Sequence, residues 1–197
     1  MQTYARQGGT SSIFVHEDGL QIISEEQRQE RIAFYANHNI GWVARPKHDG
    51  SAGGFKRAGR FKKASNMNYG LALSMKLEKH LRILEDAMDR GEVIEEEGQS
   101  LEDKALEMAI EETYEETGGK WRPWASNGKS IRMGEIILIV DSDTVVPEVS
   151  GAANALSSVS HIECRTVCAM PLVNSPSALR LPSYSTNLVG FLLLHSS

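Results

Sequence analysis

The segment that most constrains the fold is Glu135–Val140 (EIILIV), an apolar run that leads directly into Asp141, Ser142 and Asp143. A short run of Ile, Leu and Val predicts a buried strand. The two carboxylates that follow are two positions apart, so a turn can direct both of them to one side. Hard divalent cations such as Mg²⁺ or Mn²⁺ prefer oxygen ligands of this kind. A surface turn in which Asp residues cap the backbone is the alternative, and the pattern alone leaves both open.

Strand and helix signals alternate along the first two thirds of the chain. Strands are expected at Ser12–His16, Ile40–Arg45 and Glu135–Val140. Helices are expected from Ser24 to about His38, from Ala64 or Ser65 to Gly91 and from Ser100 to Gly118, with a loop over Trp121–Gly134. Such alternation predicts an α/β fold with a mainly parallel sheet. Ligands of these sheets lie at the carboxyl ends of the strands, where Glu17-Asp18-Gly19 and Asp141-Ser142-Asp143 both fall.

A basic, glycine-rich stretch follows the second expected strand. Residues Arg45 to Lys63 include seven Lys or Arg and one Asp, with Gly50, Gly53, Gly54 and Gly59 among them. Glycine lets a backbone approach an anion closely, and Lys and Arg supply the opposing charge. The stretch is therefore either a solvated surface loop or a loop that closes on phosphate.

An acidic stretch occupies the two long expected helices. From Glu78 to Glu116 there are fifteen acids and four Lys or Arg. A charge run of this kind usually forms a solvated helix face, and binding of a basic partner is the functional alternative.

Composition excludes several classes of protein. A net charge of −5 is not typical of a nucleic-acid-binding protein. No stretch approaches the roughly 20 apolar residues of a membrane-spanning helix, and the first residues lack the apolar core of a secretory signal. Two cysteines do not make a disulfide framework. A zinc site is not expected either, because no common zinc spacing fits His161, Glu163, Cys164 and Cys168.

Three motifs resemble one enzyme family. Lys63–Asn68 (KASNMN) resembles the K-A-G-N-L-N element of inverting family-two glycosyltransferases of the cellulose, hyaluronan and chitin synthase type. Ile13–Gly19 (IFVHEDG) resembles the strand and D-D-G turn of these enzymes, and Ile137–Glu148 (ILIVDSDTVVPE) resembles their metal-binding D-x-D strand end. The motifs stand in the family's order over roughly Gln2–Glu148 and are most similar to the fungal polysaccharide-synthase-like branch.

The resemblance implies a glycosyltransferase A-type, Rossmann-like fold that binds a UDP-sugar with Mg²⁺ or Mn²⁺. It implies that Asp18 contacts the uracil or ribose and that Lys63 lies near the nucleotide. Asn66 and Asn68 would order their loop. Asp141 and Asp143 would serve the nucleotide sugar and the metal, with Asp143 favoured for direct coordination. Glu17 and Ser65 stand where relatives often have Asp and Gly.

The resemblance also suggests that the chain is a fragment. Residues 1–148 are expected to form a partial glycosyltransferase A-type domain with a helical insertion at 69–118, and residues 149–197 an atypical C-terminal tail of low order. A retained intron or a shifted reading frame would produce such a tail. Within it, Leu188–Leu194 is either a buried strand or a sticky tail.

The acceptor-side acid and the Q-x-x-R-W element of the family do not follow Glu148, so no catalytic residue is assigned and binding without transfer to a polysaccharide acceptor is expected. This chain would be cytoplasmic. Full-length relatives are integral membrane proteins whose catalytic domain faces the cytosol.

Two other hypotheses are compatible with the sequence. One is a non-catalytic interaction protein that binds a basic partner through the acidic helices, with salt-sensitive affinity. The other is a nucleotidyltransferase, which also uses paired carboxylates and a metal. That class is expected to carry a glycine-rich phosphate loop near its first strand, and none is visible.

Overall fold

The computed structural model describes residues 10–58, 62–92, 98–134, 136–141, 169–171 and 188–195. The strands are β1 (Thr10–Glu17), β2 (Gly41–Ala44), β3 (Trp124–Ser126), β4 (Ile136–Asp141), β5 (Ala169–Pro171) and β6 (Leu188–His195). The helices are α2 (Glu25–Asn37), α3 (Lys62–Asp89), α4 (Leu101–Glu116) and α5 (Gly128–Ile131). The expected α/β class is confirmed.

The six strands form one sheet in the order β3-β2-β1-β6-β4-β5. β1 and β2 are parallel, and the other paired strands are antiparallel. The prediction of a mainly parallel sheet is therefore wrong for the described strands. The physical reason is that β6 runs between β1 and β4 and is antiparallel to both, while β3 returns antiparallel to β2.

β1, β2 and β4 nevertheless run in the same direction, because the two antiparallel steps through β6 cancel. Their carboxyl ends consequently meet at one edge of the sheet, here called the carboxyl edge. Val189 of β6 lies opposite His16 of β1 on one side and opposite Asp141 of β4 on the other. The backbones of His16 and Asp141 are thus level, one strand apart, which corresponds to about 10 Å.

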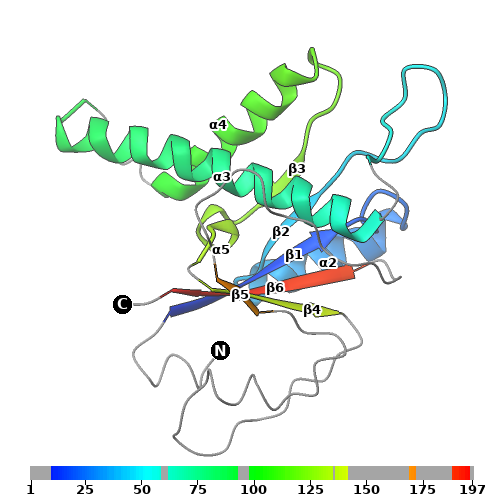
Figure 1. Ribbon diagram of the computed structural model, residues 1–197, viewed down its shortest axis with the longest axis horizontal. Helices are drawn as coiled ribbons and strands as arrows, with labels where there is room; N and C mark the ends of the chain where they lie inside the picture. Colours follow the sequence, from blue (N-terminus) through cyan, green and yellow to red (C-terminus); the bar gives the residue numbers. More distant parts are fainter. Residues whose placement is uncertain are drawn as a thin grey trace, which may run out of the picture.

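Helices cover both faces of the sheet (Figure 1). Alternate side chains of β1 and β2 face opposite ways, as in any strand. Phe14 and Val43 pack with α3, α4 and α5 in one core. Val15 and Trp42 pack with Tyr35 of α2 in the other. All four residues of β2 are buried because both faces are covered.

The sequence signals for helix ends locate most boundaries correctly. The Ser24 side chain accepts from the Gln27 N–H and the Gln27 side chain accepts from the Ser24 N–H, which confirms the capping box of α2. Ser100 caps α4 in the same manner through the Asp103 N–H. α3 begins at Lys62, slightly earlier than expected.

Two local predictions are wrong. Trp121–Gly134 is not a plain loop, because it contains β3 and α5. Asn127 is the N-cap of α5: its side chain accepts from the Ser130 N–H and its backbone adopts the left-handed conformation. The spacing of Leu77, Leu81, Leu84 and Met88 by four, three and four residues predicts that all four lie on one buried face of the helix. The three leucines are buried, but Met88 is 40% exposed, because in the last turn of α3 the buried residue is its neighbour Ala87.

Of the two alternatives for Leu188–Leu194, the strand is the one found, and it forms most of β6. The proposed domain division between residues 148 and 149 stays a prediction. Within the described residues, no helix combines the length and the apolar character needed to cross a membrane.

Candidate functional site

A buried ion pair lies where β1 and β2 end at the carboxyl edge. Arg45 Nε donates to Asp18 Oδ1 at 3.0 Å, and Arg45 Nη2 donates to Asp18 Oδ2 at 2.6 Å. The Arg45 side chain is 1% exposed and that of Asp18 is 11% exposed. A two-point contact between guanidinium and carboxylate is strong and directional. Removing two charges from water is costly, so this pair is weak evidence for stability and better evidence for a site.

A second guanidinium approaches the same carboxylate. Arg57 Nη1 lies 3.4 Å from Asp18 Oδ2. The Arg57 side chain is 18% exposed, and its Nε is buried without a hydrogen-bond partner among the described residues. Asp18 therefore faces two guanidinium groups, and this group of three side chains carries one net positive charge.

The neighbouring carboxylate, Glu17, supports the turn that presents Asp18. The Gly19 N–H donates to Glu17 Oε1 at 2.8 Å. Tyr35 Oη and Arg31 Nη1 both donate to Glu17 Oε2, at 2.7 Å and 3.0 Å. Burial, reinforced by the hydrogen bond to Glu17, raises the pKa of Tyr35 well above its ordinary value. A Cβ at position 19 would lie 2.7 Å from Glu17 Oε1, so a larger residue there would have to displace the Glu17 carboxylate.

The first turns of α3 are docked onto the end of β1. Arg45 Nη1 donates to the Ser65 hydroxyl at 2.9 Å, and Asn66 Nδ2 donates to the His16 carbonyl at 3.3 Å. His16 Nδ1 lies 3.2 Å from the Asn66 carbonyl, which assigns the proton to that nitrogen. The pKa of His16 is lowered to about 3, chiefly by complete burial and also by the charge of Arg45, although the hydrogen bond to Asn66 raises it, so the imidazole is neutral. Gly70 permits this docking, since a Cβ there would lie 2.2 Å from His16 Cε1.

The described part of the basic loop, residues 46–58, is folded back on itself. The Asp49 N–H donates to the Phe55 carbonyl at 2.9 Å, and the Ser51 N–H donates to Asp49 Oδ1 at 2.9 Å. This hydrogen bond lowers the pKa of Asp49. The Phe55 ring packs edge-on against Tyr69 of α3 and against Trp121. The loop is thereby tied to α3 and to the segment that follows α4.

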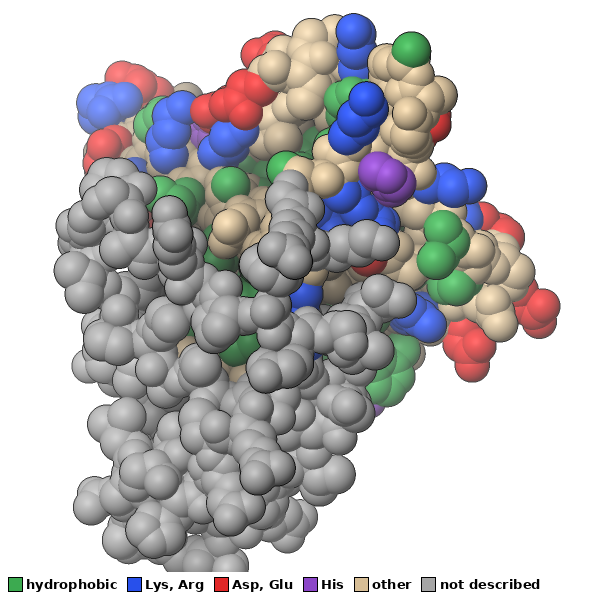
Figure 2. Space-filling model, turned by 45° about the vertical axis from the view of Figure 1, so that its right-hand side comes forward, with side chains coloured by type: hydrophobic (Ala, Val, Ile, Leu, Met, Phe, Trp, Pro, Cys, Tyr) green, Lys and Arg blue, Asp and Glu red, His purple; other side chains and the backbone are tan. Residues whose placement is uncertain are grey.

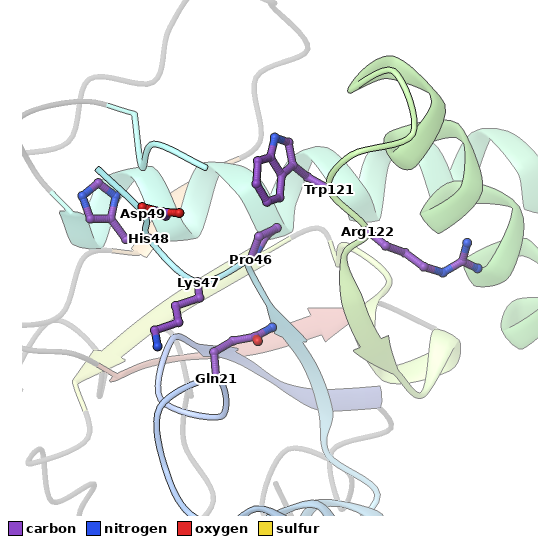
Figure 3. A pocket seen from close by; sticks show the side chains of 7 residues that line it. All are labelled: Gln21, Pro46, Lys47, His48, Asp49, Trp121 and Arg122. Atoms are coloured by element: carbon purple, nitrogen blue, oxygen red, sulfur yellow. The ribbon is translucent and has the colours of Figure 1, made fainter. Parts of the chain in front are cut away.

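An open cavity of about 560 Å³ lies beside this loop. Its lining comes from the turn after β1, the start of the basic loop and the segment before β3: Gln21, Pro46, Lys47, His48, Asp49, Trp121 and Arg122. Figure 3 shows the Trp121 ring above Pro46, whereas Arg122 extends away toward α4, where it pairs with Glu111. This volume is within the range of small-molecule sites.

The structure brings together part of the predicted site. Asp18, Lys63 and Asn66 lie around the ends of β1 and β2 and the start of α3. Asn68 is exposed on α3. Asn66 and Asn68 are both helical residues of α3, and their expected role in ordering the neighbouring loop stays a prediction.

The two predicted metal ligands belong to β4 and to the residues after it. The Asp141 backbone ends β4 at the same edge, level with His16. Asp143 lies outside the described residues. In the parts of the chain that the structure describes, no three His, Cys, Asp or Glu side chains converge as metal ligands. The carboxylates of Asp141 and Asp143 have the chemistry that Mg²⁺ or Mn²⁺ prefers.

Sequence reasoning missed the partners of the acids. Arg45 was one of seven cations in the basic stretch, and its position directly after a strand was the available signal. Glu17 and Ser65 were noted only as departures from the family pattern, yet Glu17 accepts three hydrogen bonds and Ser65 accepts one from Arg45. Nothing in the local sequence indicated that Trp121 would reach the basic loop.

Lys and Arg side chains gather around one His on the face seen in Figure 2.

Comparisons with protein-family models, with curated proteins and with solved structures each found no match to this chain.

Proposed function

We propose that the chain binds a nucleotide sugar, with a UDP-sugar as the first candidate, at the carboxyl edge of the sheet. The observation that carries the proposal is the buried two-point contact between the Arg45 guanidinium and the Asp18 carboxylate. This contact holds the charged Asp18 side chain where β1 and β2 end. Parallel strands of Rossmann-like folds bind ligands at this position. The chain is proposed to be part of a glycosyltransferase that faces the cytosol and to bind its donor without transferring the sugar on its own.

A divalent metal is part of this proposal. A diphosphate leaving group needs its charge neutralised, and Mg²⁺ or Mn²⁺ would supply that charge when bound. Asp141 and Asp143 are the proposed ligands, and the strand register supports this, because β4 ends level with His16. Lys63 and the arginines beside Asp18 would add positive charge from the other side of β6.

Calorimetric titration of UDP in the presence of Mn²⁺ tests the proposal. We expect Asp143→Asn to weaken Mn²⁺-dependent UDP binding by at least about tenfold, because one charged metal ligand is lost. Asp86→Asn, at an exposed position of α3, is the matched control and should bind as the unmodified chain does. Equal heats from the unmodified chain and from Asp143→Asn would count against metal-assisted binding.

The interaction-protein alternative has less support from the described residues. Several acids of the α3–α4 pair are already engaged by basic side chains of the same chain: Glu78 with Arg132, Glu111 with Arg122, Glu112 with Lys79 and His80, and Glu116 with Lys76. A basic partner would have to compete with these contacts. Salt-sensitive binding to polylysine that UDP does not alter would favour this alternative over ours.

A further inference from the structure

Arg57 is the cation at the carboxyl edge that Asp18 does not fully satisfy. Arg45 already donates to both Asp18 oxygens, and the Arg57 contact of 3.4 Å falls on an oxygen that Arg45 holds at 2.6 Å. Arg57 Nε is buried and has no partner among the described residues. A buried N–H without a partner costs free energy, so its presence here indicates a missing acceptor.

The basic loop fixes Arg57 close to the cavity. The Arg57 N–H donates to His48 Nδ1 at 3.2 Å, and His48 lines the cavity together with Lys47. Two residues before Arg57, Phe55 anchors the loop on Tyr69 and Trp121. Arg57 is therefore connected to Asp18 through its side chain and to the cavity wall through its backbone.

We propose that Arg57 is the phosphate-binding residue of this site and that it exchanges Asp18 for a phosphate group of the ligand. The planar guanidinium fork matches a phosphate as well as it matches a carboxylate. Asp18 keeps its two bonds to Arg45 after the exchange, so no buried carboxylate is left unpaired. The net positive charge of the three side chains favours an incoming anion. That the ligand is a nucleotide rests on the proposed function. That a phosphate binds here rests on the contacts of Arg57 alone.

Metal-free titrations of the full chain with UDP, pyrophosphate and uridine test this inference. Arg57→Gln should weaken UDP and pyrophosphate binding by about tenfold, because a charge-assisted hydrogen bond is lost, and should leave any uridine binding unchanged. Lys56→Gln removes the same charge from the adjacent, exposed position and should stay within about twofold of the unmodified chain. Arg57→Lys keeps the positive charge but lacks the planar guanidinium, so its affinity for UDP and pyrophosphate should fall between those of Arg57→Gln and Lys56→Gln. Arg57→Lys also tests the assignment if Arg57→Gln does not fold.

The outcomes separate this inference from the proposed function. If UDP binds and Arg57→Gln binds it equally well, or if Lys56→Gln loses as much affinity, the Arg57 assignment is overturned while nucleotide binding stands. If pyrophosphate binding depends on Arg57 but UDP binds no more tightly than pyrophosphate, the phosphate site stands and the nucleotide proposal loses its support. If neither UDP nor pyrophosphate binds the unmodified chain without metal, the Arg57 assignment is overturned, and the proposed function is then decided by the Mn²⁺ titration.

Discussion

The carboxyl edge and the α3–α4 helix pair are both rich in ion pairs, but the pairs differ in their exposure to solvent. On the helix pair, Lys79 is 58% exposed in its contact with Glu112, and Glu116 is 57% exposed in its contact with Lys76. At the carboxyl edge, Arg45 and Asp18 are nearly inaccessible. Surface pairs contribute little to stability, whereas a buried pair is costly and strongly coupled. Buried charges therefore indicate the position of the site better than a high density of surface charges does.

The largest effect should come from breaking the buried pair. Arg45→Gln leaves the Asp18 carboxylate buried with only the longer Arg57 contact, so we expect a loss of about 3 kcal/mol in the free energy of unfolding by urea. The double variant Asp18→Asn/Arg45→Gln should recover part of that loss, since no buried charge is then left without its main partner. A loss below about 1 kcal/mol for Arg45→Gln would place this pair with the surface pairs.

The docking of α3 on β1 should show the next largest effect. Gly→Ala normally stabilises a helix interior, but at position 70 the new Cβ meets the buried His16 ring and Val43. We expect Gly70→Ala to lower the free energy of unfolding by about 2 kcal/mol. Asn68→Ala, at an exposed position on the same helix, should be neutral or slightly stabilising by helix propensity. A stabilising Gly70→Ala would show that α3 does not pack closely on β1.

The pH dependence of stability tests the burial of His16. The pKa of His16 is about 3 in the folded chain and 6.5 as its ordinary value, so between these values the unfolded state binds the additional proton. His16 therefore contributes stability above pH 6.5 that is lost as the pH falls, by about 1.4 kcal/mol per pH unit within this window.

Urea unfolding of the unmodified chain and of His16→Gln at several pH values measures this contribution. The stability of the unmodified chain should fall more steeply between pH 6 and pH 4.5 than that of His16→Gln. His38→Gln, at the exposed C-cap of α2, should keep the steep fall. Parallel curves for the unmodified chain and His16→Gln would show that His16 is not buried as a neutral side chain.

The smallest effect is expected on the helix pair. Glu116→Gln removes the charge that Lys76 contacts, but Glu116 is largely solvated. The free energy of unfolding should change by no more than about 0.5 kcal/mol, and the change should shrink further in high salt. A loss comparable to that of Arg45→Gln would remove the contrast between the two regions.

Local signals predicted most of the elements, because their causes lie within a few residues. The Ser24 capping box, the Ser100 cap and the apolar run before Asp141 each specify an element through neighbouring side chains. Helix α5 escaped prediction because its cap is one left-handed Asn127 between short elements.

The sheet order and the site partners could not be read from local sequence. β6 pairs with β1 across almost the whole chain, and no local pattern specifies which strand an apolar segment joins. Asp18 and Arg45 are separated by 27 positions, and their pairing depends on β1 and β2 being parallel. The positions of acids at strand ends were predictable, while the cations that hold them were not.

Paramagnetic broadening of backbone amide signals by Mn²⁺ with UDP tests the convergence of the site most directly. α3 begins at the site and extends about 40 Å away from it over 28 residues, so one helix provides its own control. We predict strong broadening at residues 17–19, 44–46 and 63–66, decreasing along α3 to little at residues 85–89, and reversal by a chelator. Uniform broadening along α3, or broadening centred on the acidic ends of α3 and α4, would contradict a ligand site at the carboxyl edge.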